Sequence, residues 1–140
     1  MAIRVAINGF GRIGRAFVRL SKGRNIDIVA VNDLGSLENL AYLLKYDTVY
    51  GRAPFSVETK GGALIMDGKE VKFLSEKEPT KLPWKDLAID VVVESTGLFT
   101  DYEKASVHIQ AGARRVVITA PVKGESVLGA TVLIGVNQEK

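Results

Sequence analysis

The sequence predicts an α/β fold, with a doubly wound, mostly parallel sheet and a β-hairpin insertion. Three observations predict it. Short β-branched apolar segments alternate with amphipathic helical segments, and a glycine-rich turn joins the first apolar segment to the first helical one. The composition, 46% hydrophobic and 25% charged over 140 residues, is typical of one globular domain. We find no linker or internal repeat, so residues 1–140 are expected to form a single domain.

The expected elements begin with a βαβ unit. It comprises a strand at 3–7, a helix at 11–21 that ends before Gly23, and a strand at 27–31. Apolar residues at three- and four-residue spacing predict a second helix, which Ser36 caps and which ends near Lys45. Glycine turn pairs within 55–75 predict a hairpin or meander, followed by a third parallel strand at 71–74.

The second half repeats the alternation. A loop with a short helical turn precedes a buried fourth strand at 89–93. A helix is expected at 101–111, with Thr100 as its cap, and the fifth and sixth strands are expected at 116–118 and 132–134. Because crossovers between parallel strands are right-handed, the expected strand order is 3-2-1-4-5-6.

The turn after the first strand has the spacing G-x-G-x-x-G. Gly9 permits the tight turn, Gly11 lets a pyrophosphate approach the backbone, and Gly14 lets the helix pack closely against the strand. The new helix offers unpaired N–H groups and its positive dipole end to an anion. A purely structural turn is the alternative. The residues expected to bind the cofactor here are Asn8, Gly9, Gly11, Arg12 and Ile13.

The second strand ends in Asn32 and Asp33, which are both expected to bind the cofactor, and Asp33 lies nineteen residues after Gly14. This spacing matches the acidic residue that binds a ribose in dinucleotide-binding sites. The charge of Asp33 would repel the additional phosphate of NADP, so NAD is the favoured cofactor. The alternative for Asp33 is an Asx turn that closes the strand. Together these features predict a Rossmann-type domain that binds NAD.

Five motifs follow each other in one order: INGFGRIGR, AVNDL, LLKYDTVYGR, ESTGLF and ITAP. In this order they closely resemble the phosphorylating glyceraldehyde-3-phosphate dehydrogenases of glycolysis, over the whole chain. The resemblance implies the N-terminal NAD-binding domain of such an oxidoreductase. It also implies that the catalytic cysteine, the catalytic histidine and the substrate phosphate sites belong to a following catalytic domain. Relatives that use erythrose 4-phosphate share the cofactor motifs, so the substrate of the parent enzyme stays open.

The resemblance assigns roles to further loop residues. Lys77 matches a basic residue that contacts the adenine end of the cofactor. Ser95, Thr96 and Gly97 match a loop on the adenosine side, and Thr119 matches a position that hydrogen-bonds toward the nicotinamide side. Without the resemblance, these residues would be interpreted as a solvated lysine, a turn and a threonine at a strand end.

The residue composition excludes several kinds of catalytic and metal-binding site. The sequence contains no cysteine, which excludes disulfides, thiolate metal sites and a cysteine nucleophile within these 140 residues. No spacing of carboxylates or histidines indicates a metal site or an acid/base pair, so we expect neither a metal nor a catalytic residue. The single histidine, His108, is expected to be a surface or packed helix residue. The isolated chain is therefore expected to bind NAD without catalysing the reaction.

The net charge of +3 is spread along the chain, without the dense basic and aromatic pattern of a nucleic-acid-binding surface. No apolar segment suggests a membrane span or a signal peptide, so a cytoplasmic location is expected. The expected partners are NAD, the catalytic domain and, in the full-length parent, further copies in a homo-oligomer. The competing hypothesis is a stand-alone nucleotide-binding or interaction module, with weak RNA binding in the same groove.

Overall fold

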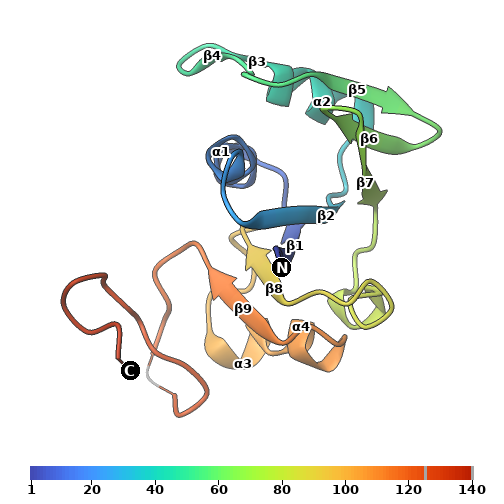
Figure 1. The fold of residues 1–140 in the computed structure, drawn as a ribbon. Helices are drawn as coiled ribbons and strands as arrows, with labels where there is room; N and C mark the ends of the chain where they lie inside the picture. Colours follow the sequence, from blue (N-terminus) through green and yellow to red (C-terminus); the bar gives the residue numbers. More distant parts are fainter. Residues whose placement is uncertain (125, 140) are drawn as a thin grey trace.

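The computed structural model describes residues 1–124 and 126–139 (Figure 1). Its helices are α1 (Arg12–Ser21), α2 (Leu37–Lys45), α3 (Tyr102–Ala105) and α4 (Val107–Gln110), with a 3-10 turn η1 (Pro79–Lys81). Its strands are β1 (Ile3–Asn8), β2 (Ile26–Asn32), β3 (Tyr46–Asp47), β4 (Gly51–Arg52), β5 (Val57–Lys60), β6 (Ala63–Met66), β7 (Lys69–Leu74), β8 (Val91–Glu94) and β9 (Arg115–Ile118).

The main sheet has the strand order β5-β6-β7-β2-β1-β8-β9. The five strands from β7 to β9 are parallel, and β5, β6 and β7 form an antiparallel meander at one side. This arrangement confirms the predicted α/β fold with a hairpin insertion. It also confirms the expected order for the first five parallel strands. Ser36 caps α2 as expected, because its Oγ accepts a hydrogen bond from the backbone N–H of Asn39 at 3.2 Å.

The predicted sixth strand is wrong. Residues 132–134 form no strand, and the segment after β9 runs away from the sheet (Figure 1). Its backbone groups are used locally: the N–H of Leu133 donates to Oδ1 of Asn137 at 2.6 Å, and the N–H of Asn137 donates to the carbonyl of Leu133. An apolar β-branched run favours a strand only where a neighbouring strand receives its hydrogen bonds, and none of the described strands lies beside this segment.

The predicted single helix at 101–111 is also wrong, because it is divided into α3 and α4. The division is at Ser106, whose Oγ donates to the carbonyl of Glu103 at 2.5 Å and competes with regular helical bonding. Thr100 is not the cap. Asp101 caps α3 instead, with its Oδ1 accepting from the N–H of Lys104 at 2.7 Å.

The small β3–β4 hairpin was not expected from the sequence. Its turn is stabilised by Asp47, whose Oδ1 accepts hydrogen bonds from the N–H groups of Val49 and Tyr50 at 2.7 and 2.8 Å. Arg19 of α1 also donates to the carbonyls of Leu44 and Gly51, which ties this hairpin to the first helix.

Apolar side chains pack against both faces of the sheet, as the alternation of side chains along β1 requires. On one face, Val5 and Ile7 pack with residues of α1, α2 and the meander, including the fully buried Leu44. On the other, Ala6 packs in a cluster with the fully buried Trp84. Figure 1 shows α1 and α2 on one side of the sheet and α3 and α4 on the other. The strand ends are therefore held between two packed layers.

Candidate dinucleotide-binding site

The predicted site residues lie at the carboxyl edge of the parallel strands. Asn8 is paired in register with Asn32 of β2 and with Glu94 of β8, and Glu94 is paired with Ile118 of β9. The four strands therefore end at the same level. β1 lies between β2 and β8, where the strand order reverses, and sheets of this kind bind ligands at that point.

The glycine turn is shaped by close contacts. Gly9 has a φ of +93°, and an added Cβ would lie only 2.6 Å from the backbone nitrogen of Thr96. A Cβ on Gly14 would collide with the carbonyl oxygen of Gly9. A Cβ on Gly11 would meet no atom within 4 Å. Gly9 and Gly14 thus bring strand, helix and neighbouring loop together, while Gly11 borders open space where a pyrophosphate would approach.

The first turn of α1 is open to an anion. Among the described residues, no side chain caps the helix at Gly11, and its first turn holds no acidic residue. Gly11, Arg12 and Ile13 are exposed, so the free N–H groups at this helix start face solvent. Behind the turn, Arg15 donates from Nη1 to the carbonyl of Phe10 at 2.9 Å. Partial burial lowers the pKa of Arg15, but an arginine stays protonated at neutral pH.

Asp33 connects the second strand to the glycine turn. Its Oδ2 accepts a hydrogen bond from the N–H of Phe10 at 2.7 Å, and its Oδ1 accepts one from the N–H of Gly35 at 2.7 Å. The Asx turn that the sequence left open is therefore present. It does not use up the carboxylate, because each oxygen keeps further acceptor capacity.

Asn8 and Asn32 are buried, and their side chains hold other loops in place. Nδ2 of Asn32 donates to Oδ1 of Asn8 at 2.8 Å and to the carbonyl of Glu76 at 2.9 Å. The backbone N–H of Gly9 donates to the carbonyl of Asn32 at 2.8 Å. These asparagines therefore contribute to the site through the loops that they support.

The remaining predicted residues lie in loops at the same edge. The Ser95 hydroxyl donates to the carbonyl of Gly9 at 2.6 Å, and Thr96 Oγ1 lies against the Glu94 carboxylate. Gly97 and Lys77 are exposed. Thr119 is exposed at the end of β9, with its Oγ1 donating to the carbonyl of Glu94 at 3.2 Å.

Comparison with known proteins identifies the family. Residues 3–102 match the family described as glyceraldehyde 3-phosphate dehydrogenase, NAD binding domain. The chain belongs to this family. The resemblance inferred from the five ordered motifs is thereby confirmed, and the matched range contains both the glycine turn and Asp33.

Individual relatives agree with this. The chain is 54% identical over 140 residues to the glyceraldehyde-3-phosphate dehydrogenase of Thermotoga maritima. It is 48% identical over 141 residues to that of Geobacillus stearothermophilus, and 52% identical over 127 residues to the cytosolic enzyme of Trypanosoma brucei brucei. The matches cover 98%, 100% and 90% of this chain. They cover only 41%, 41% and 38% of the three relatives, so the chain spans well under half of their length.

Sequence reasoning missed one group in this dehydrogenase-family domain. Glu94 is 2% exposed, and His108, left open as a surface or packed residue, is completely buried beside it. Burial raises the pKa of Glu94, but hydrogen bonds from His108, Thr96 and Asn8 outweigh this effect and hold the pKa below its ordinary value. The available signal was an acidic residue that directly follows three valines of a buried strand.

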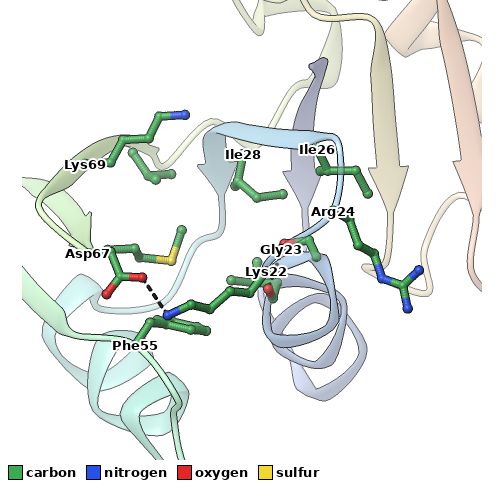
Figure 2. Close-up of a pocket in the computed structure, with 12 residues that line it drawn as sticks. Lys22, Gly23, Arg24, Ile26, Ile28, Phe55, Asp67 and Lys69 are labelled. Carbon is green, nitrogen blue, oxygen red and sulfur yellow. Dashed lines mark hydrogen bonds and ion pairs between the residues drawn. The ribbon is translucent and has the colours of Figure 1, made fainter. Parts of the chain in front are cut away.

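A cavity of about 190 Å³ lies at the opposite edge of the domain (Figure 2). It is bordered by the end of α1 and the starts of β2 and β7, with Ile26, Ile28 and Phe55 in its lining and an ion pair between Lys22 Nζ and Asp67 Oδ2 at 2.8 Å. None of the predicted cofactor-binding residues lines it. The candidate site is therefore based on the chemistry of the carboxyl edge and not on this hollow.

Residues 1–124 and 126–139 contain neither a metal-binding cluster of side chains nor a membrane-spanning helix. Within them, no group of three or more histidine, cysteine, aspartate or glutamate side chains is arranged to hold a metal ion. The helices of the same part of the chain are all too short or too polar to cross a membrane.

Proposed function

We propose that this domain binds NAD at the carboxyl edge of its sheet. The observation that carries the proposal is the contact between Asp33 and the glycine turn, where Oδ2 accepts from the N–H of Phe10 at 2.7 Å. This contact sets an acceptor for ribose hydroxyls directly beside the open start of α1, the group that favours a pyrophosphate. The ribose and the pyrophosphate are neighbours in a dinucleotide, and Asp33 and the start of α1 are neighbours in this structure.

The assignments at the glycine turn follow from position, and those of the other loop residues follow from the family resemblance. The N–H groups of Arg12 and Ile13 bind the pyrophosphate, and the open space beside Gly11 admits it. The loop of Thr96 and Gly97, together with Lys77, borders the adenosine, and Thr119 lies toward the nicotinamide. NAD would supply the hydride acceptor. The domain itself binds the dinucleotide, orients it and selects against NADP through the charge of Asp33.

We further propose that the whole protein is a phosphorylating glyceraldehyde-3-phosphate dehydrogenase and that these 140 residues do not catalyse the reaction alone. The covalent step needs a nucleophile such as a cysteine thiolate, and this sequence has no cysteine. The purified chain, saturated with NAD, should form no NADH from glyceraldehyde 3-phosphate and phosphate. Activity that persists after removal of trace full-length enzyme would contradict this.

Titration calorimetry of the purified chain tests cofactor binding directly. NAD should bind more tightly than NADP, and Asp33→Ala should weaken NAD and narrow the difference, because it removes a ribose acceptor and a repulsive charge. Asp67→Ala is the matched control, since it removes a carboxylate from the opposite edge and should leave both affinities unchanged. Equal or inverted affinities in the unmodified chain would contradict the proposal.

Several apolar side chains of this domain are exposed, which favours the proposal that other protein surfaces cover them. Val127, Ile134 and Val136 are among them, and Tyr50 of the turn between β3 and β4 is another. We propose that the catalytic domain and further copies of the protein cover such surfaces. The isolated chain should therefore self-associate, which light scattering over a dilution series measures. A uniform monomer at high concentration would argue against it.

A further inference from the structure

We propose that Glu94 and His108 are positioning residues that set the geometry of the cofactor loops through a continuous chain of buried hydrogen bonds. The inference rests on the proposed binding of NAD, because it assigns these residues to the same edge of the sheet. Neither side chain reaches that surface, since Glu94 is 2% exposed and His108 is fully buried. They act through Thr96 and Asn8.

The Glu94 carboxylate is saturated with hydrogen bonds. Oε1 accepts from the backbone N–H and the hydroxyl of Thr96, at 3.0 and 2.5 Å. Oε2 accepts from Nδ2 of Asn8 at 2.7 Å and from Nε2 of His108 at 2.6 Å. Each oxygen thus has two donors and no site left for a proton of its own. The arrangement requires the ionised carboxylate, and it fixes Thr96 at two points.

Trp84 determines which nitrogen of His108 carries the proton. An indole N–H can only donate, and Nε1 of Trp84 lies 3.0 Å from Nδ1 of His108. Nδ1 must therefore accept, which leaves the proton on Nε2, where it donates to Glu94. The contact between His108 and Glu94 is thus a hydrogen bond from a neutral imidazole, and Trp84 holds the ring in the orientation that makes it.

The chain of hydrogen bonds continues through the neighbouring strands. Oδ1 of Asn8 accepts from Asn32, and Asn32 in turn accepts from the N–H of Glu76 at 2.8 Å. Loops after β8, β1, β2 and β7 are thereby connected. The tight fit of Gly9 against Thr96 transmits any shift at Glu94 to the glycine turn. A disturbed Glu94 should consequently alter NAD binding, although it contacts no cofactor atom.

Nuclear magnetic resonance of the ring nitrogens tests the tautomer in the unmodified chain. The chain has one histidine and one tryptophan, so the imidazole signals belong to His108 and the indole signal belongs to Trp84. We expect the ring to carry its proton on Nε2, with Nδ1 as the acceptor. Trp84→Phe should release this preference, because it removes the donor to Nδ1. A charged ring, or one protonated at Nδ1 in the unmodified chain, would overturn the proposal.

Substitutions test the positioning role. Glu94→Gln and His108→Leu should each weaken NAD binding roughly tenfold, the equivalent of losing one hydrogen bond. His108→Gln should recover part of the loss, because its amide N–H can donate to Glu94. In Glu94→Leu, which has no acceptor for the Thr96 donors, the amide proton of Thr96 should also lose its protection from solvent exchange, while the amides of β1 keep theirs. Val92→Ala on the same strand is the control, because it creates a buried gap without touching these hydrogen bonds.

The outcomes separate three cases. Variants that lose thermal stability like Val92→Ala but bind NAD as tightly as the unmodified chain would show a merely structural role and overturn the inference. Should the unmodified chain not bind NAD, the proposed function fails, while the tautomer and the Thr96 exchange still decide whether the loops are positioned in this way. If Glu94→Gln does not fold, the comparison of His108→Leu with His108→Gln gives the answer.

Discussion

The two edges of the parallel sheet differ in the polarity of their buried side chains. At the carboxyl edge, Asn8, Asn32, Glu94 and His108 are polar side chains that are all at most 4% exposed and bonded to one another. At the opposite edge, the cavity of Figure 2 has mainly apolar walls, and its Lys22–Asp67 ion pair is exposed to solvent. The carboxyl edge thus combines a buried hydrogen-bond network with an uncapped helix start, whereas the opposite edge contains a cavity.

A hollow in a protein surface does not by itself indicate a binding site. Apolar walls stabilise the fold by removing surface from water, and they do so without specifying a ligand. Buried polar groups are costly unless every one is bonded, so a complete network constrains the geometry of the loops that it joins. We therefore expect changes at the carboxyl edge to alter ligand binding, and changes at the opposite edge to alter stability alone.

Gly9→Ala should have the largest effect, because it should reduce both NAD binding and the stability of the fold. The left-handed backbone conformation costs about 1–2 kcal/mol for a residue with a Cβ. The collision with Thr96 adds a further cost of about 1–3 kcal/mol. We expect NAD binding to be lost together with much of the stability, as calorimetry and chemical denaturation would show. A stable variant that retains affinity would mean that the contact between turn and loop is dispensable.

Gly11→Val should abolish binding while leaving the domain folded. Nothing lies within 4 Å of an added Cβ, so the free protein accommodates the side chain, but the branched group occupies the approach of the pyrophosphate. Loss of the charged hydrogen bonds should weaken NAD by roughly a hundredfold or more, equivalent to about 2.7 kcal/mol. Circular dichroism checks the fold and calorimetry the affinity. Retained binding would contradict the assignment of the phosphate turn.

Val71→Ala should show the reverse pattern. Val71 is fully buried and lines the cavity at the opposite edge, so truncation should lower the free energy of unfolding by about 2 kcal/mol. NAD affinity should not change. A clear loss of affinity in a folded Val71→Ala would break the separation of roles between the two edges.

Acid should weaken the carboxyl edge. Burial raises the pKa of Glu94, but the hydrogen bonds that it accepts outweigh this and hold the pKa below its ordinary value. A carboxyl group with a lowered pKa in the folded state stabilises the fold above its unfolded pKa, and that contribution is lost as the pH falls through the folded value. As the pH falls from the ordinary carboxyl range through the lowered pKa of Glu94, the free energy of unfolding should therefore decline more steeply for the unmodified chain than for Glu94→Gln.

Asp67 provides the comparison for this smallest effect. Its pKa is also lowered, first by the hydrogen bond from Lys22, but its side chain is exposed. Asp67→Asn should change the acid profile much less than Glu94→Gln does, because solvent screens exposed pairs. Denaturant titrations at a series of pH values measure both, and equal changes would mean that burial of the carboxylate has no special effect.

Much of the fold and part of the site could be predicted because their causes are local. The spacing of Gly9, Gly11 and Gly14 determines a turn through sterics within a few residues, and apolar runs of β-branched residues predict buried strands. Asp33 was found because it directly follows one of those strands. Predictions that rested on local preference alone were also wrong in places, as for the expected strand 132–134 and the expected cap Thr100.

The positioning network could not be read from local patterns. Glu94 is separated by 86 residues from Asn8 and by 14 from His108, and Trp84 by 24 from His108. Each residue taken singly resembles an ordinary strand end, helix position or loop aromatic. Local patterns were sufficient to predict where the parallel strands of the sheet end and where an anion can meet a helix. The pairing of buried donors with acceptors depends on the folded chain, because such bonds form where separate strands end side by side inside a packed core.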